Sequence, residues 1–300
     1  MLVDSQVQEQ KQGIKVCSID DPDYPPLLKE IHGAPEKLWY RGTWPKQPWH
    51  GIGVVGSRKM SVYGKNILPP LVHDMARSGL VVVSGLAYGV DALAHESTLE
   101  VGGTTIAVVG GGVDDESMYP ADHLGLAHRI IENGGVVVSE SPPGMHPAKY
   151  SFPLRNRIIA GMSLGVLVAQ GLARSGSLIT AQCALEQNRE VFALPGPLTD
   201  PLSEGPHMLI KKGAKLVTCL QDIFDTFEFL SLPKEYARPE SNPENEVEAS
   251  ILAVMSSDPV HIDTLIQICK RESHIVSSAL LMLEMRGVVR NVGSMYYVKI

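Results

Sequence analysis

The sequence predicts an α/β protein with an extended Rossmann-like, doubly wound, mostly parallel sheet and a small C-terminal winged-helix domain. Three observations predict this fold. From residue 51 onward, short apolar runs rich in Val and Ile alternate with longer stretches of helical spacing. The chain has 300 residues, of which 44% are hydrophobic, enough for one large core and an appendage. Residues 246–300 show three helical stretches followed by a hairpin pattern.

The apolar runs are the predicted strands. They read GIGVVG (51–56), LVVVSG (80–85), TTIAVVG (104–110), GVVVSE (135–140), LGVLVAQ (164–170) and EVFALPG (190–196). Continuous apolar strands separated by helices are typical of a parallel sheet that is covered on both faces. We therefore predict a Rossmann-like domain over residues 51–230.

Three further segments complete the predicted domain organisation. Residues 1–50 place several prolines between large apolar residues and are too short for an independent core, so we expect a lead-in packed on the sheet. Residues 231–245 are proline-rich and polar, which indicates a linker. Residues 246–300 form the predicted winged-helix domain.

Composition restricts the function classes. The net charge of −7 argues against a generally basic nucleic-acid coat, although it leaves room for a local basic groove. The four cysteines are scattered without metal-ligand or disulfide spacing, which favours a reducing compartment. The sequence shows neither a signal peptide nor a membrane-spanning apolar run. We expect a cytoplasmic protein with no metal, no cofactor and no membrane partner.

Ligands of such sheets bind beyond the carboxyl ends of the strands. After the first strand, Gly56, Ser57 and Arg58 offer backbone N–H groups, a hydroxyl and a guanidinium, which together suit a phosphate. A tight turn would explain the Gly-Ser pair equally well, because the full GxGxxG fingerprint is missing. Two later turns supply the small residues Ser84, Gly85, Ser175 and Gly176 for close approach of a ligand to the backbone.

The same loops give little support to catalysis. The sequence has neither a GxxxxGK[ST] loop nor a GxSxG elbow, so we predict no catalytic residue. Asp91 and His95 have the spacing of one helical face and could form an acid/base pair. The alternatives are a first-turn carboxylate that favours the helix dipole and a structural histidine.

The segment AKYSFPLRNRIIAGM (148–162) follows the fourth predicted strand. It places Lys149, Arg155, Asn156 and Arg157 around Phe152 at the same sheet edge as the first loop. Cations that follow a phosphate backbone, beside an aromatic ring on which a base can stack, are the parts of a single-strand binding groove. A solvated helical face is the alternative for such a run of charges.

The chain resembles the DNA-processing protein A family (DprA, also called Smf) over nearly its whole length. The segments that carry the resemblance include YPPLLKEIHGAPEKLWYRG, VVGSRKMSVYG, VSGLAYGVDALAHE, FPLRNRIIAG and SGSLITAQCALEQNREVFALPG. The resemblance implies a non-enzymatic, homodimeric protein that binds single-stranded DNA without sequence preference. It further implies protection of incoming DNA in natural transformation and loading of the RecA recombinase. Arg58, Lys149 and Phe152 match the positions that contact the strand in the family.

The C-terminal module resembles the winged-helix domain of many family members. Its third helical stretch, SHIVSSALLMLEMRG, has no Lys or Arg before Arg286. A helix that reads DNA normally carries Arg, Lys, Asn or Gln toward bases and phosphates. We therefore favour a protein-contact or regulatory role for this module.

Two other functions remain open at this stage. The Rossmann variant also resembles nucleoside-monophosphate phosphoribohydrolases, but the turn RSGSLITAQCALE lacks their double glycine and offers only the distant Glu186. A nucleotide-sensing regulator that binds duplex DNA through the wing is the second alternative. The weakly basic third helix argues against it.

Overall fold

The structure is a computed structural model of the chain. It describes residues 12–227, 229–230, 243, 245–255, 258–285 and 288–299. Two compact units are present, Met1–Leu232 and Pro233–Ile300, and each is described by itself. Most of the predicted linker, and Arg286, lie outside the described residues.

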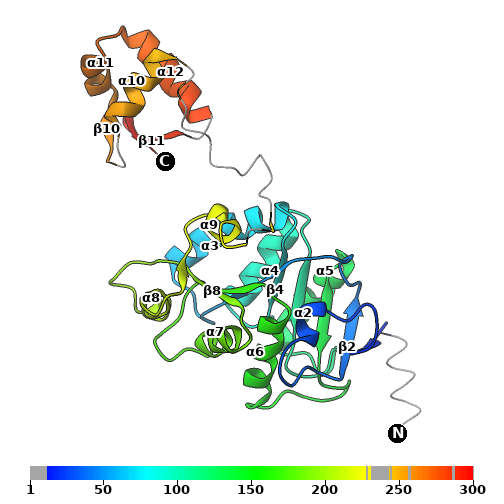
Figure 1. The fold of residues 1–300 in the computed structure, drawn as a ribbon. Coiled ribbons are helices and arrows are strands. Elements are labelled where there is room, and N and C mark those ends of the chain that lie inside the picture. Colours follow the sequence, from blue (N-terminus) through cyan, green and yellow to red (C-terminus); the bar gives the residue numbers. More distant parts are fainter. Residues whose placement is uncertain are drawn as a thin grey trace. The chain divides into compact units, whose positions relative to one another are not determined.

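A nine-stranded sheet forms the centre of the first unit in the part of the chain that the structure describes (Figure 1). The strand order is β1-β2-β6-β5-β4-β3-β7-β8-β9. The bounds are β1 Lys15–Ser18, β2 Lys37–Gly42, β3 Gly51–Val55, β4 Val81–Ser84, β5 Thr105–Val108, β6 Val136–Ser139, β7 Gly165–Val168, β8 Glu190–Ala193 and β9 Lys215–Leu216. In the sheet order, every neighbouring pair in the series β6-β5-β4-β3-β7-β8-β9 is parallel. The predicted doubly wound, mostly parallel sheet is therefore confirmed.

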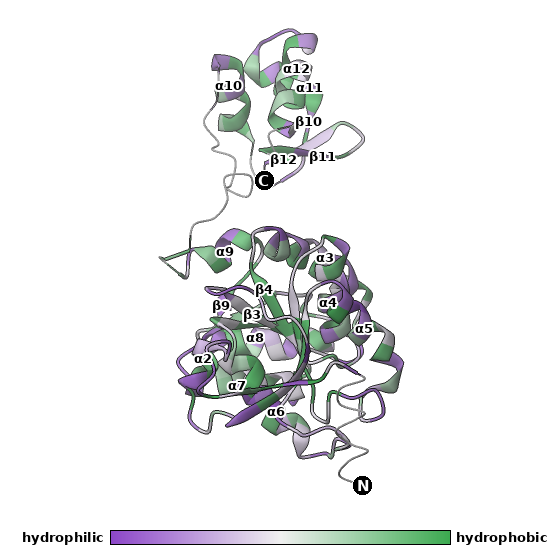
Figure 2. Cartoon of the chain, turned by 90° about the vertical axis from the view of Figure 1, so that its right-hand side faces the viewer, coloured by the Kyte–Doolittle hydropathy of each residue, from purple (hydrophilic) through white to green (hydrophobic). Residues whose placement is uncertain are grey.

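Helices cover both faces of the sheet. On one face lie α3, α4 and α5, which follow β3, β4 and β5, and on the other lie α6 and α7 (Figure 1). Their bounds are α3 Val62–Arg77, α4 Val90–Glu100, α5 Leu124–Glu132, α6 Ser151–Gly161 and α7 Gly176–Glu186; shorter helices are α2 Pro26–Lys29, α8 Glu204–Lys211 and α9 Leu220–Phe224. Every residue of β3 through β7 is buried. Burial on both faces explains the unbroken apolar runs, and the central strands are green in Figure 2.

The N-terminal lead-in contributes strands to the sheet itself and is more than a cover. Strand β2 pairs antiparallel with β6, and β1 pairs antiparallel with β2. Buried and accessible residues are mixed along β2, as expected for a strand near the sheet edge. The short helix α2 lies under α6, where Leu28 is fully buried against Gly161.

The chain reverses its winding direction between β6 and β7. The strands from β3 to β6 progress to one side of the sheet, whereas β7 returns to pair with β3 on its other side. The connection must cross β5, β4 and β3, a span of about 19 Å at roughly 4.8 Å per strand. Residues 140–150 and α6 make this crossing. The N-terminus of α6 therefore lies near the carboxyl ends of the central strands.

The second unit has the predicted winged-helix fold. Its helices are α10 Glu246–Val254, α11 Ile262–Cys269 and α12 Ser273–Met285, and its sheet has the order β10-β12-β11 in the described residues. The strands are β10 Val260–His261, β11 Val289–Gly293 and β12 Tyr296–Lys299. Leu265, Leu280 and Leu283 form the centre of its own small core. This core is what allows so short a segment to fold as a unit.

Candidate nucleic-acid interface

A cavity of about 300 Å³ opens beyond the carboxyl ends of β3 and β7. These two strands flank the point where the winding reverses, which is where open α/β sheets bind ligands. The structure brings most of the predicted site residues to this cavity, and its lining includes Gly56, Ser57, Arg58, Phe152, Arg155, Asn156, Ser175 and Gly176. Ser84, Gly85, Lys149 and Arg157 are not in its lining.

The loop after β3 presents Arg58 to solvent. Ser57 Oγ donates to the carbonyl of Lys59 at 2.7 Å and accepts from its N–H at 3.1 Å, so this hydroxyl shapes the turn. A Cβ on Gly56 would lie 2.6 Å from the Val90 side chain, so glycine is required for close packing there. Arg58 is exposed, and its guanidinium carbon lies 5.5 Å from the centre of the Phe152 ring.

Phe152 lies in the first turn of α6 and is half-buried. Its ring packs against the backbone of Gly110, where an added Cβ would be 3.4 Å from the ring. The Tyr119 ring lies beside it, with 5.6 Å between ring centroids. Lys149 is exposed three residues before Phe152, just ahead of the helix. The first turn of α6 thus presents an aromatic ring beside the exposed Arg58, and the exposed Lys149 precedes it in the chain.

Arg155 has a different environment from the one predicted, because its side chain is buried. Nη1 donates to the carbonyl of Gly85 at 2.6 Å and to the carbonyl of Val108. Gly85 must lack a side chain, since a Cβ would overlap the guanidinium. Burial lowers the pKa of Arg155, and the nearby Asp91 opposes that shift. Arg155 therefore connects α6 to the ends of β4 and β5 and at the same time lines the cavity.

Arg157 and Ser84 are also engaged within the protein. Arg157 Nη2 donates to both carboxylate oxygens of Glu140 at 2.6 Å. The fully buried Ser84 hydroxyl donates to the carbonyl of Val54 at 2.6 Å. Arg155, Arg157 and Ser84 thus each make hydrogen bonds within the protein.

The start of α7 forms another wall of the cavity. Ser175 is its N-cap and accepts a hydrogen bond from the Ser177 N–H at 3.3 Å. Gly176 has open space where a side chain would stand, and Asn156 Nδ2 approaches its carbonyl at 3.5 Å. Small residues and a helix N-terminus suit an anionic or polar ligand.

Asp91 lies at the start of α4, where it is buried and lines the same cavity. Burial raises its pKa to about 6, while Arg155 and backbone hydrogen bonds at Ala87 and Gly85 act in the opposite direction. Below it, His95 is fully buried with Nδ1 2.7 Å from the Thr105 hydroxyl. Burial lowers the pKa of His95 to about 3, which favours the neutral ring.

The raised pKa of Asp91 predicts a pH-dependent difference between wild type and Asp91→Asn. A folded-state pKa of about 6 exceeds the ordinary value of 3.8, so protonation stabilises the folded state below pH 3.8, and this contribution is lost as the pH rises through 6. The free energy of unfolding of the variant, relative to that of wild type, should therefore be about 2 kcal/mol higher at pH 7 than at pH 4. Urea unfolding at both pH values measures this, and an equal difference at the two would contradict the assignment.

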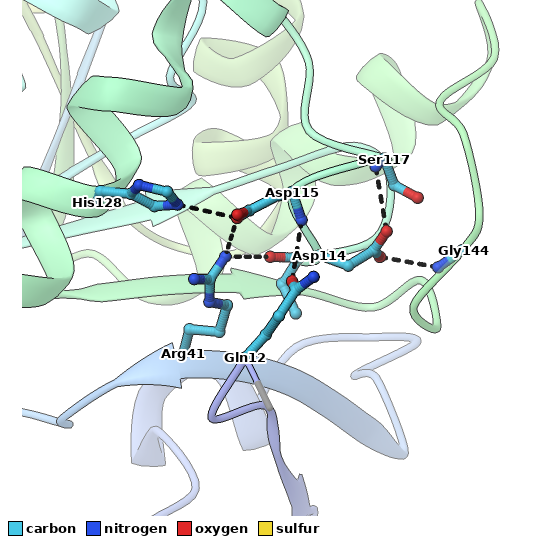
Figure 3. A network of polar contacts seen from close by, with 8 residues as sticks. Gln12, Arg41, Asp114, Asp115, Ser117, His128 and Gly144 are labelled. Atoms are coloured by element: carbon cyan, nitrogen blue, oxygen red, sulfur yellow. Dashed lines mark hydrogen bonds and ion pairs between the residues drawn. The ribbon is translucent and has the colours of Figure 1, made fainter. Parts of the chain in front are cut away.

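A polar network holds the loop after β5, which carries Tyr119 (Figure 3). Arg41 of β2 pairs with the Asp115 carboxylate and donates to the Val113 carbonyl at 3.3 Å. His128 Nε2 of α5 lies 2.9 Å from Asp115 Oδ1. Asp114 accepts from the Ser117 and Gly144 N–H groups at 3.1 and 2.7 Å. The lead-in strand therefore positions a loop at the opening of the site.

Comparison with known proteins decides the family. Residues 15–228 match the family described as DNA recombination-mediator protein A, and residues 235–293 match the DprA winged helix domain. The chain belongs to the DprA/Smf family. It is 46% identical over 210 residues to Protein Smf of Escherichia coli (strain K12), covering 70% of this chain and 56% of that protein. It is 44% identical to DNA processing protein DprA of Bacillus subtilis (strain 168), covering 72% of each chain.

Two solved DprA structures share the fold. DprA of Streptococcus pneumoniae superposes with a TM-score of 0.68 at 44% identity, over 76% of this chain and 79% of that one. DNA processing protein A of Helicobacter pylori superposes with a TM-score of 0.62 at 28% identity, over 71% and 95% of the two chains. The H. pylori structure was described for the single-stranded DNA binding mode of that protein.

Two residues of this DprA/Smf chain were not singled out from the sequence. Tyr88 and Tyr119 expose 39% and 46% of their surface and line a hollow with Arg58 and Phe152. Both lie in loops that follow predicted strands, so an exposed aromatic at a strand end was the available signal. Among the described residues, no helix is long and apolar enough to span a membrane, and no His, Cys, Asp and Glu cluster could hold a metal.

Proposed function

We propose that this chain binds single-stranded DNA without sequence preference at the carboxyl edge of its sheet. One observation carries the proposal: the exposed Arg58 guanidinium lies 5.5 Å from the centre of the half-buried Phe152 ring at the cavity on the switch point. A cation beside a stacking ring matches the two demands of a single strand, a charged backbone and an unpaired base. The single-strand binding mode described for the H. pylori relative supports the same assignment.

Each residue has a separate role in this proposal. Arg58 and Lys149 contact phosphates, and Phe152 stacks a base. Asn156, Ser175 and Gly176 offer polar groups and space in the cavity wall. Gly56, Ser57, Ser84, Gly85, Arg155 and Arg157 shape and support the site through contacts inside the protein.

Binding across a salt series tests the proposal. A mixed-sequence oligonucleotide should bind more tightly single-stranded than duplex at matched salt, and Arg58→Ala and Lys149→Ala should each weaken binding. Each should also flatten the slope of log K against log salt by about 0.7, because one phosphate contact is lost. The control is Lys15→Ala, since Lys15 contacts the Gly42 carbonyl at the opposite sheet edge.

Two outcomes would replace the proposal. A clear preference for duplex DNA of one sequence would favour the winged-helix regulator. Release of ribose phosphate from nucleotides would favour the phosphoribohydrolase. If Arg58→Ala and Lys149→Ala both bind single strands as tightly as wild type, the interface does not include the loop after β3.

We further propose the finer functions that the family resemblance implies. The protein protects incoming DNA, loads RecA, acts as a homodimer in the cytoplasm and catalyses no reaction. Protection of a bound oligonucleotide from nuclease tests the first function. Assembly of RecA filaments in the presence of a single-strand binding protein tests the loading of RecA. Sedimentation of the full chain tests the third.

The winged-helix unit has a separate proposed role in protein contact. Helix α12 contains no Lys or Arg, and its Leu281 and Met282 are each 57% exposed. Exposed apolar side chains suit a protein surface better than a phosphate backbone. Replacing both with Ser should leave single-strand affinity unchanged.

A further inference from the structure

We infer that the bound strand continues past Phe152 onto a second base-stacking surface formed by Tyr119 and Tyr88. This inference rests on the proposed function and adds a ligand subsite to it. The ligand is the nucleobase next to the one on Phe152, recognised by its flat face and not by its identity.

The two tyrosines and the predicted strand-binding residues converge on one hollow. Arg58, Tyr88, Tyr119 and Phe152 all line it, although they come from four different loops or helices. The Tyr119 and Phe152 ring centroids are 5.6 Å apart, and the rings are tilted by 54°. Tyr119 is 46% exposed and Tyr88 is 39% exposed, so both have ring surface that a ligand can cover.

Spacing determines how a base can approach these rings. A base sandwiched between two parallel rings needs about 6.8 Å, twice the roughly 3.4 Å rise of stacked DNA. The 5.6 Å separation of Tyr119 and Phe152 is too small for that arrangement. Successive bases must therefore cover the accessible ring surfaces one after another, and the aromatic residues act as a continuous track.

The Tyr88 ring is held in place by contacts within the protein. Tyr88 Oη donates to Asp122 at 2.7 Å, and its ring lies 4.8 Å from that of His123. His123 Nδ1 lies 2.7 Å from the Leu86 carbonyl, which joins the loop after β4 to the loop after β5. Leu86 is fully buried with φ of 58°, a left-handed conformation that a leucine rarely adopts and that the packing must maintain.

The charges around the two tyrosines favour a base over a phosphate. The Asp122 carboxylate lies at the Tyr88 hydroxyl, where it would repel a phosphate. Two cations line this hollow: the exposed Arg58, whose guanidinium lies over the Phe152 ring, and the buried Arg155. The strand should therefore keep its backbone near Arg58 and turn its bases toward the tyrosines.

Alanine substitution in the 300-residue chain tests the subsite. Tyr119→Ala and Tyr88→Ala should each weaken binding of a mixed-sequence single strand by roughly 5- to 150-fold, the usual effect of losing a base–aromatic stack. The slope of log K against log salt should not change, because no charge is removed. Tyr119→Phe should keep the affinity. Tyr296→Ala removes a similarly exposed tyrosine (42%) of the second unit and should also keep it.

Oligonucleotides with a single abasic position make the test specific. If Tyr119 stacks a base, removing that base at one abasic position should weaken binding by wild type. The same abasic oligonucleotide should bind Tyr119→Ala no more weakly than the intact oligonucleotide does. The two losses are then non-additive in a double-mutant cycle. Additive losses at every position, or unchanged affinity in both alanine variants, would overturn the subsite. If Arg58→Ala still weakens binding in that case, the proposed function survives; if wild type fails to bind single strands, the proposed function itself fails.

Discussion

Arg155→Met is expected to lower the free energy of unfolding of the first unit by about 3–5 kcal/mol, the usual cost of removing one partner of a buried charged contact. The substitution leaves the carbonyls of Gly85 and Val108 without their guanidinium donor in the interior. It also removes the cation that opposes the desolvation of Asp91. Urea or thermal unfolding of wild type and variant measures the loss.

A matched substitution on the same helix provides the control. Arg157→Met removes a guanidinium that pairs with Glu140, but their side chains are 22% and 41% exposed. Solvent screens such a pair, so we expect a loss of about 1 kcal/mol or less. Equal losses in the two variants would show that Arg155 does not carry the connection between α6 and the strand ends.

Phe152→Ala is expected to weaken single-strand binding by about 1–3 kcal/mol, the range measured for a lost base–aromatic stack. Part of the loss comes from Arg58, because the ring under its guanidinium contributes roughly 0.5–1 kcal/mol at an exposed site. The slope of log K against log salt should remain that of wild type, since no charge is removed. Fluorescence anisotropy across a salt series measures both quantities.

Two further variants separate stacking from packing. Phe152→Leu keeps an apolar side chain over Gly110 but has no aromatic face, so it should lose affinity and retain stability. The double variant with Arg58→Ala should lose less than the sum of the single variants, because the two groups touch. Strict additivity would mean that Phe152 and Arg58 contact the strand independently.

The fold was predictable because its signal is local and repeated. Buried parallel strands must be apolar along their whole length, so each of the six predicted runs contains a strand. The role of the lead-in was harder to predict. Strand β2 completes the sheet by pairing with β6 almost 100 residues later, and such a pairing leaves no mark on the short sequence KLWYRG.

The site was predictable only in part. Loops that follow parallel strands meet at one edge of the sheet. The order of strands and loops along the chain was therefore enough to place Gly56, Arg58, Phe152 and Gly176 together. Arg155 and Arg157 follow Phe152 closely and carry the expected charge, yet both contact the protein itself. Tyr88 and Tyr119 lie on loops of the same edge, but the sequence does not show that the two loops touch.

By itself, the sequence determined the family, the order along the chain of the six strands β3 to β8, and the edge of the sheet where a ligand can bind. These follow from residue type and spacing, which act over a few positions along the chain. Only the tertiary structure decided which cations are accessible, because the direction of a side chain depends on what packs beside it. Thus Arg58 lies exposed over a ring while Arg155 is buried under the same cavity. The free energy of burial, set by neighbours from distant segments, makes that distinction.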